Sequence, residues 1–389
     1  MRRVKFGLIG CGLMGREFAS ALARWCHLPD MPARPELVAV CDRFDSLPAD
    51  LGRRWYTENF PSVQQATSDY KELLANPEVE AVYCPVPHHL HQEFYCAALK
   101  AGKHLMGEKP FGIDQSANRA ILAELQKHPE LQVRCSSEYP FFPAVQRIGD
   151  MIEREAFGRV LEANCGFLHS SDLDPHKPIN WKRQVEFNGE YGCMGDLGMH
   201  VCHIPFRAGW RPRNVRAILS KIVTDRPDGK GGMAPCRTWD NATLFCEAEY
   251  DAGGPMFPLT MKTQRIAPGE KNTWYLEILG MKASARFSTR NPRRLELLEY
   301  GGGEQSWQQL DMGQETAFKT ITGSIFEFGF SDAILQMWAA FVYELATGQR
   351  RKPFAGCVTP EETALSHELF TAALESHRRT QVVSIESAG

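Results

Sequence analysis

The sequence lacks any apolar run approaching the ~20 residues that span a bilayer, so no transmembrane helix is expected. It also lacks an excess of charge, since 44 Lys and Arg oppose 47 Asp and Glu for a formal net charge of −3. This balance removes the broad positive surface that nucleic-acid or anionic-membrane binding requires. The chain begins Met-Arg-Arg and passes directly into the strand-like run 4–9, without a signal-peptide or lipidation pattern. We therefore expect a cytoplasmic protein that binds neither nucleic acid nor membrane.

Cysteine is not scarce, but the patterns that would give it a special role are missing. None of the 12 cysteines forms a Cys-x-x-Cys pair, and Cys41, Cys84 and Cys246 lie inside apolar, strand-like runs. Small buried hydrophobic residues occur in such places. We interpret the cysteines as reduced structural thiols of a reducing compartment.

The first third of the chain alternates short apolar runs with helical periodicity. A chain of 389 residues exceeds one ordinary core, which predicts at least two domains. The alternation is typical of βαβ units and a parallel sheet. Strands are expected at 4–9, 37–41, 81–86, 104–107 and 131–135, and helices at 14–25, 92–101 and 114–127.

The remainder has a different character, with successive longer segments of rough apolar alternation. Such a series of strands predicts a mostly antiparallel sheet in an α+β domain. The boundary is expected near residue 135, giving domains 1–135 and 136–389. Strands are expected at 160–167, 215–222, 242–250, 256–265, 275–279 and 283–288, and helices at 333–347 and 361–376.

A glycine-rich turn joins the first strand to the first helix. Gly10-Cys11-Gly12-Leu13-Met14-Gly15 has the pattern G-x-G-x-x-G. The first glycine allows a tight turn, the second lets a pyrophosphate approach the backbone, and the third lets the helix pack on the strand. The helix N-terminus offers unpaired N–H groups to the anion. The turn predicts a dinucleotide site that contacts Gly10, Gly12, Leu13, Met14 and Gly15.

An acidic residue, Asp42, ends the next expected strand. It comes later than is usual after such a motif because a proline-bearing insertion, 27–36, precedes the strand. A carboxylate here would accept hydrogen bonds from ribose hydroxyls and repel a 2′-phosphate, which favours NAD. NADP stays open, because the guanidinium of the adjacent Arg43 could hold that phosphate.

Two further segments carry residues suited to acid–base chemistry. Glu108-Lys109-Pro110 follows the strand expected at 104–107, where the carboxyl ends of parallel strands border the ligand crevice. Partial desolvation beside a cationic nicotinamide would lower the pKa of Lys109 toward a useful range. Asp196 and His200 are spaced four residues apart, so that on a helix they share one face. Histidine is suited to take the hydroxyl proton when an alcohol is oxidised.

A metal site is the competing interpretation of the second segment. It would draw on side chains of the ligand types that zinc prefers, although their spacing matches no strong zinc pattern, and we expect no metal. The candidate ligands are Asp196, His200, Cys202 and His203, with His88, His89 and His91 in reserve.

Taken in order, these motifs resemble the glucose–fructose oxidoreductase / inositol dehydrogenase / rhizopine catabolism family, Gfo/Idh/MocA, over nearly the whole chain. Glu108-Lys109-Pro110 is the most specific of them. The other matching segments are Gly10–Gly15, Val40–Arg43, Val86–His91, Phe142-Pro143-Ala144, Asn180-Trp181-Lys182, Gly195–His200 and Ile278-Leu279-Gly280. Val86, His88 and Lys182 depart from the family's usual Thr, Asn and Arg.

The resemblance implies a Rossmann domain followed by an α+β domain with a large, open antiparallel sheet, whose exposed face makes oligomer contacts. It implies that Lys109 relays protons and holds the reacting hydroxyl, that Asp196 orients the substrate and that His200 is the general base. Pro87, His88, His91, Glu108 and Lys109 then become cofactor neighbours, and Trp181 and Lys182 substrate neighbours.

We therefore predict an NAD(P)-dependent dehydrogenase that acts on a secondary hydroxyl of a sugar, cyclitol or related polyol, and that forms a homodimer or homotetramer through the open sheet. Two alternatives remain. One is a glycoside-cleaving enzyme that holds NAD permanently and oxidises its sugar only transiently. The other is a non-catalytic dinucleotide-sensing regulator on the same fold.

Overall fold

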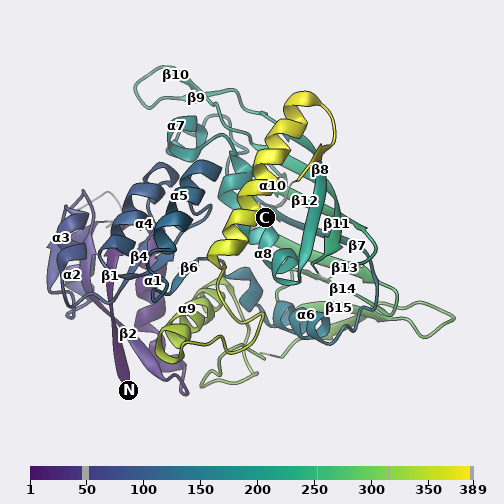
Figure 1. Ribbon diagram of the computed structural model, residues 1–389, viewed down its shortest axis with the longest axis horizontal. Helices are drawn as coiled ribbons and strands as arrows, with labels where there is room; N and C mark the ends of the chain where they lie inside the picture. The colour runs from purple at the N-terminus through teal and green to yellow at the C-terminus, as the bar shows by residue number, and fades with distance from the viewer. Residues whose placement is uncertain (46–51, 252, 314, 386–389) are drawn as a thin grey trace. The chain divides into compact units, whose positions relative to one another are not determined.

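The computed structural model describes residues 1–45, 52–251, 253–313 and 315–385 (Figure 1). The chain folds into two compact units. Unit 1 comprises residues 1–112, 116–141 and 314–360, and unit 2 comprises 113–115, 142–313 and 361–389. Within the described residues, no helix is both long enough and apolar enough to cross a membrane.

Unit 1 is built on a six-stranded parallel sheet of order β3-β2-β1-β4-β5-β6. Its strands are β1 (Arg2–Ile9), β2 (Ala33–Cys41), β3 (Gln65–Thr67), β4 (Ala81–Cys84), β5 (His104–Gly107) and β6 (Val133–Cys135). The helices are α1 (Leu13–Ala23), α2 (Arg53–Asn59), α3 (Tyr70–Ala75), α4 (His91–Lys100), α5 (Gln115–Leu125) and α9 (Phe330–Thr347), with short 3₁₀ turns η1 (Trp25–His27), η2 (His88–Leu90) and η3 (Tyr139–Phe141). This order is that of a Rossmann fold, with the reversal of strand order between β1 and β4.

Helix α9 joins unit 1 although it lies late in the sequence. It lies beside β1 and β2 (Figure 1). Its Trp338 ring packs 4.1 Å from the ring of Phe18 on α1 and 4.7 Å from the ring of Tyr83 on β4, measured between centroids. The sequence-based boundary at residue 135 placed this segment with the second domain. The structure groups it with unit 1 because its apolar face completes the core beside α1.

Unit 2 is built on a nine-stranded sheet of order β16-β15-β14-β13-β7-β12-β11-β8-β17. All neighbouring pairs are antiparallel except β7 and β12. The strands are β7 (Val160–Leu168), β8 (Trp210–Ser220), β11 (Asn241–Tyr250), β12 (Phe257–Gln264), β13 (Thr273–Gly280), β14 (Ala283–Ser288), β15 (Arg294–Glu299), β16 (Gln308–Asp311) and β17 (Val383–Ser384), and a separate hairpin pairs β9 (Asp225–Pro227) with β10 (Met233–Pro235). The predicted fold class, a Rossmann domain plus a mostly antiparallel sheet domain, is confirmed.

One face of the unit 2 sheet is covered by helices. Alternate residues of the central strands, such as Leu244 and Cys246 on β11, are buried, and their neighbour Phe245 is exposed. Helix α10 lies along this sheet in Figure 1, and its Ser376 hydroxyl accepts a hydrogen bond from the Ala217 amide of β8 at 2.9 Å. The helical elements are α6 (Pro143–Glu153), η4 (Trp181–Arg183), α7 (Val185–Asn188), the π-helical turn η5 (Met194–Gly198), α8 (Met199–Arg207) and α10 (Pro360–Arg379).

Candidate active site

The glycine turn of unit 1 has a different local environment at each glycine. Gly10 has φ +108°, and a Cβ there would lie 2.8 Å from the carbonyl oxygen of Pro85. A Cβ on Gly15 would lie 2.6 Å from the carbonyl oxygen of Gly10 and 2.7 Å from the Tyr56 hydroxyl. At Gly12, by contrast, a Cβ would meet nothing within 4 Å. The first and third glycines are therefore required by packing, and the second leaves open space at the N-terminus of α1, as a pyrophosphate requires.

Asp42 stands at the end of β2 and is tied to this turn. Its carboxylate accepts hydrogen bonds from the backbone amide of Cys11 at 2.8 Å and from that of Phe44 at 3.0 Å. Arg43 is exposed, and its guanidinium lies 4.6 Å from the centre of the Phe44 ring. The predicted cofactor residues Leu13 and Met14 begin α1, with Leu13 largely exposed. The structure thus brings Asp42 and the glycine turn together, as the sequence predicted.

The segment after β5 carries Glu108 and the half-buried Lys109. The Glu108 carboxylate accepts hydrogen bonds from the Tyr83 hydroxyl and from the Ser136 hydroxyl, both at 2.7 Å. The Glu108 amide donates to the hydroxyl of Tyr95 at 2.7 Å. These contacts come from β4, from α4 and from the residues after β6. They hold the backbone next to Lys109 at the carboxyl edge of the sheet.

His88 and His91, predicted as cofactor neighbours, are both buried after Pro87. The His91 ring nitrogens lie 3.0 Å from the carbonyl oxygen of Val86 and 3.2 Å from the amide nitrogen of Gly112. Since an amide can only donate, Nδ1 is the acceptor and Nε2 carries the hydrogen. His91 therefore links the segment after β4 to the segment after β5, and contact of these residues with a cofactor stays a prediction.

In unit 2, Asp196 and His200 lie on one continuous helical stretch. Asp196 is in the π-helical turn η5 and His200 is in α8, one turn later. Turns of π-helix are frequent at functional sites. The His200 ring meets the Phe167 ring edge-on at 5.5 Å, and the Trp274 indole N–H donates to the His200 carbonyl at 2.9 Å. Both residues are buried in the helix that covers the sheet.

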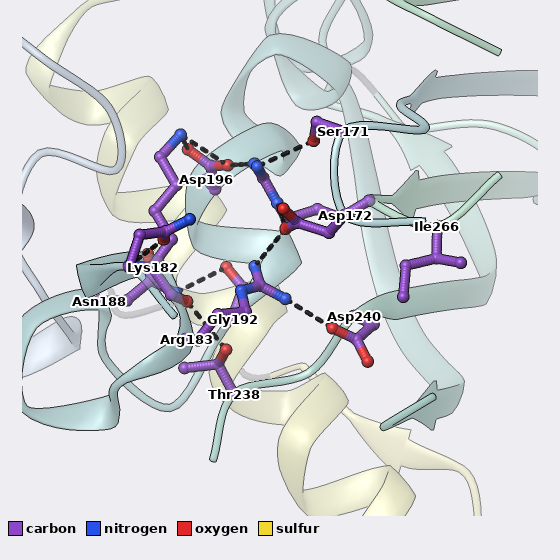
Figure 2. A network of polar contacts seen from close by, with 12 residues as sticks. Ser171, Asp172, Lys182, Arg183, Asn188, Gly192, Asp196, Thr238, Asp240 and Ile266 are labelled. Carbon is purple, nitrogen blue, oxygen red and sulfur yellow. Dashed lines mark hydrogen bonds and ion pairs between the residues drawn. The ribbon is translucent and has the colours of Figure 1, made fainter. Parts of the chain in front are cut away.

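A charged cluster surrounds Asp196, and Figure 2 shows its members close together. Lys182 Nζ lies 2.8 and 3.1 Å from the two carboxylate oxygens of Asp196. The guanidinium of Arg265 pairs with Asp196 and, through Nε at 2.7 Å, with Asp172. Arg183 pairs with Asp240 at 2.5 Å and lies 3.4 Å from Asp172. The Asp196 carboxylate is therefore held from two sides by cations.

The cluster shifts the ionisation of its members. Burial acts to raise the pKa of Asp172, but Arg265 and Arg183 outweigh it and lower that pKa to about 2. Burial and the charge of Arg265 lower the pKa of His169 to about 4. Asp172 is thus charged and His169 neutral at physiological pH. Trp181 belongs to the same region, with Lys182 Nζ 5.6 Å from the centre of its ring.

The cysteines beside this segment are buried. Cys193 accepts a hydrogen bond from the Thr263 hydroxyl at 3.5 Å, and burial raises the pKa of its thiol to about 12. Burial also raises the pKa of Cys202 well above its usual value. Such thiols are inert packing groups. In the described part of the chain, no three His, Cys, Asp or Glu side chains are grouped in a way that could hold a metal ion.

Comparison with known proteins decides the family. Residues 4–135 match the Gfo/Idh/MocA family model, described as an oxidoreductase family with an NAD-binding Rossmann fold. The chain is 30% identical over 311 residues to levoglucosan dehydrogenase of Pseudarthrobacter phenanthrenivorans, a match that covers 76% of each protein. The chain belongs to the Gfo/Idh/MocA oxidoreductase family.

Solved structures show the same fold for the whole chain of this Gfo/Idh/MocA protein. A levoglucosan dehydrogenase in complex with NADH and L-sorbose superposes with a TM-score of 0.87 at 22% identity, covering 100% of both chains. A complex of levoglucosan dehydrogenase with NADH and levoglucosan gives 0.86 at 22% identity, covering 99% of this chain and 100% of the other. These structures confirm the fold, and the 30% identical relative confirms the predicted family. Residues 4–135, nearly all of which lie in unit 1, match its NAD-binding Rossmann fold.

Sequence reasoning predicted Lys182, one partner of Asp196, but missed the rest of the charged cluster. Arg265, Asp172, Arg183 and Asp240 form most of the charged cluster, and none was predicted as a site residue. The available signal was the abundance of charge in the loop 169–190 and the arginine at the end of the strand expected at 256–265. Neither indicates which charges meet.

Proposed function

We propose that this oxidoreductase uses NAD to oxidise a secondary hydroxyl of a sugar, cyclitol or related polyol. The main support is the polar cluster that holds Asp196, one helical turn before His200. The same chain has a glycine turn with open space beside its second glycine, Gly12. The levoglucosan dehydrogenase relative supports a sugar-like substrate. The Asp42 carboxylate, fixed beside the glycine turn, favours NAD over NADP.

The mechanism assigns one task to each residue. His200 takes the hydroxyl proton of the substrate, and Lys109 holds the hydroxyl oxygen and relays protons. Asp196 is only 1% exposed, whereas the Lys182 side chain is 28% exposed. Substrate hydroxyls therefore reach Lys182 more readily, and Asp196 orients the substrate together with this lysine. Bound NAD⁺ supplies the hydride acceptor.

The test combines turnover with cofactor binding. Lys109→Met and His200→Gln should each lower kcat by about 10²–10⁴-fold on a panel of sugars, anhydrosugars and inositols, since each removes an acid–base group. NAD⁺ affinity, measured separately, should survive. His176→Gln is the matched control, because His176 is an exposed histidine of the same unit. Undiminished turnover in both site variants would refute the roles, and products without net NADH would favour transient redox in glycoside cleavage.

We further propose that the open face of the unit 2 sheet binds a second copy of the chain. Phe245 on β11 and Ile218 on β8 project from this face and are 48% and 51% exposed. They lie on adjacent strands, with Thr243 opposite Ile218. Exposed apolar residues grouped in this way mark association surfaces. Phe245→Glu should shift a dimer or tetramer toward monomer in light scattering, and an unchanged mass would contradict the proposal.

A further inference from the structure

Glu138 is a buried acid of unit 1 to which the proposed reaction assigns no task. It follows β6 and is 5% exposed. Strands β5 and β6 lie side by side with Gly107 opposite Cys135, so the segments that leave their carboxyl ends begin next to each other. The Ser136 amide donates to the Gly107 carbonyl at 3.0 Å, and the Ser136 hydroxyl donates to Glu108. Glu138 therefore belongs to the group of residues around Glu108 and Lys109.

Several charges act on the Glu138 carboxyl. Burial raises its pKa to about 7, and the carboxylates of Glu108 and of Glu17 on α1 act in the same direction. Lys109 and a backbone hydrogen bond act in the opposite direction. The Tyr83 hydroxyl on β4 is influenced by both Glu108 and Glu138, which places it with this group. The protonation of Glu138 is thus poised to respond to one further charge.

The oxidation state of the cofactor changes the charge in this region. The nicotinamide ring is a cation in NAD⁺ and neutral in NADH, and cofactors bind at the carboxyl ends of such strands. A nearby positive charge favours the carboxylate form of an acid, and its loss favours the neutral form. We propose that Glu138 stores a proton for the reaction, ionised when NAD⁺ is bound and protonated when NADH is bound. This inference rests on the proposed function, in which Lys109 holds the reacting hydroxyl, so that the nicotinamide that accepts the hydride would lie next to it.

The proton balance is one to one. During oxidation the carbon-bound hydrogen leaves with its electron pair for the ring, and the hydroxyl hydrogen leaves as a proton. The ring loses its positive charge, and Glu138 takes up this one proton after His200 has accepted it and Lys109 has relayed it. The buried charge of unit 1 is thereby the same before and after hydride transfer. Below about pH 7, NAD⁺ binding must expel the Glu138 proton. The affinity for NAD⁺ should therefore increase by up to about tenfold for each unit by which the pH is raised, while the affinity for NADH stays constant.

Calorimetry of cofactor binding to the full chain tests the inference directly. NAD⁺ and NADH are titrated at about pH 6 in two buffers of different ionisation enthalpy, which counts the protons released. An acid with a pKa of about 7 is about nine-tenths protonated there, so NAD⁺ should release about 0.9 proton and NADH close to none. Glu138→Gln should abolish the release. Glu17→Gln is the matched control and should retain it, because Glu17 only acts on Glu138 from α1.

Equal proton release by NAD⁺ and NADH in the unsubstituted protein would overturn the inference, as would undiminished release in Glu138→Gln. The first comparison uses one protein, so it decides the matter even where the variant fails to fold. If neither cofactor binds, the proposed function fails and the inference fails with it. If both bind with equal proton release, only the inference fails.

Discussion

Replacement of single glycines in the turn before α1 should separate the folding role of the motif from its cofactor role. Gly12→Ala adds a methyl group where nothing lies within 4 Å. The backbone at Gly12, φ −74° and ψ −161°, suits any residue. Gly15→Ala instead places the same methyl group 2.6 Å from the Gly10 carbonyl oxygen and 2.7 Å from the Tyr56 hydroxyl. The two variants differ only in where one methyl group is added.

The magnitudes follow from these surroundings. Overpacking a tight site costs about 1–3 kcal/mol, and at Gly15 the nearest obstacle is backbone that cannot turn aside, so Gly15→Ala should approach the upper end. Gly12 is the N-cap of α1, where exchange of glycine for alanine should cost below about 1 kcal/mol. The methyl group on residue 12 would occupy the space that a pyrophosphate needs. We expect Gly12→Ala to weaken NAD⁺ binding by about tenfold or more, which corresponds to about 1.4 kcal/mol.

Urea denaturation without cofactor measures the first effect, and calorimetric NAD⁺ titration of the folded variants measures the second. We expect Gly12→Ala to keep its stability but bind NAD⁺ weakly, and Gly15→Ala to lose stability. If Gly12→Ala binds NAD⁺ as tightly as the unsubstituted protein, the open space at Gly12 is not the phosphate site. If Gly15→Ala is as stable as Gly12→Ala, the close packing of Gly15 against the Gly10 carbonyl and Tyr56 does not hold in solution.

Three further predictions concern charged side chains. In the absence of cofactor, the pKa of Glu138 is about 7 in the folded protein and about 4.5 in the unfolded chain. The free energy of unfolding should therefore fall by about 3 kcal/mol as the pH rises from about 4.5 through about 7. Glu138→Gln should flatten this slope in urea denaturation between about pH 5 and 8, and an unchanged slope would contradict the burial of an acid there. Arg265→Met removes a cation from two buried aspartates and should lower the free energy of unfolding by about 3–5 kcal/mol. Arg290→Met, the control, breaks an exposed pair with a glutamate and should lower it by about 1 kcal/mol or less. Equal losses of stability in the two variants would refute this reasoning. Asp42→Asn should narrow the preference for NAD over NADP in direct binding assays, and an undiminished preference would remove Asp42 from cofactor selection.

The core of each unit was predictable because burial leaves a periodic record in the sequence. Because strands β1, β4 and β5 are buried on both faces over most of their length, their sequences are short continuous apolar runs. Strand β3, Gln65–Thr67, has no such run and was missed. Helix α9 was predicted as a helix but assigned to the other domain, since an apolar stripe shows that a helix is covered without showing what covers it.

The same distinction holds for the candidate site: residues marked by a local pattern were predictable, and residues that meet only in the folded chain were not. Gly12, Lys109 and His200 could be proposed from the sequence because the patterns that mark them involve residues only a few positions away: a turn, the end of a strand, the next helical turn. The environment of Asp196 depends on Arg265, which also bonds Asp172 across 93 positions of sequence. No spacing rule connects such residues, because their meeting is set by how β12 pairs with β7 and not by any local pattern. The four-residue spacing could place Asp196 and His200 on one helical stretch, but only the fold reveals that the aspartate is already held by two cations. In the proposed function, Asp196 would act on a substrate as one partner of an ion pair with the more exposed Lys182. Lys182→Ala and Asp196→Asn should then each raise the KM for the same substrates.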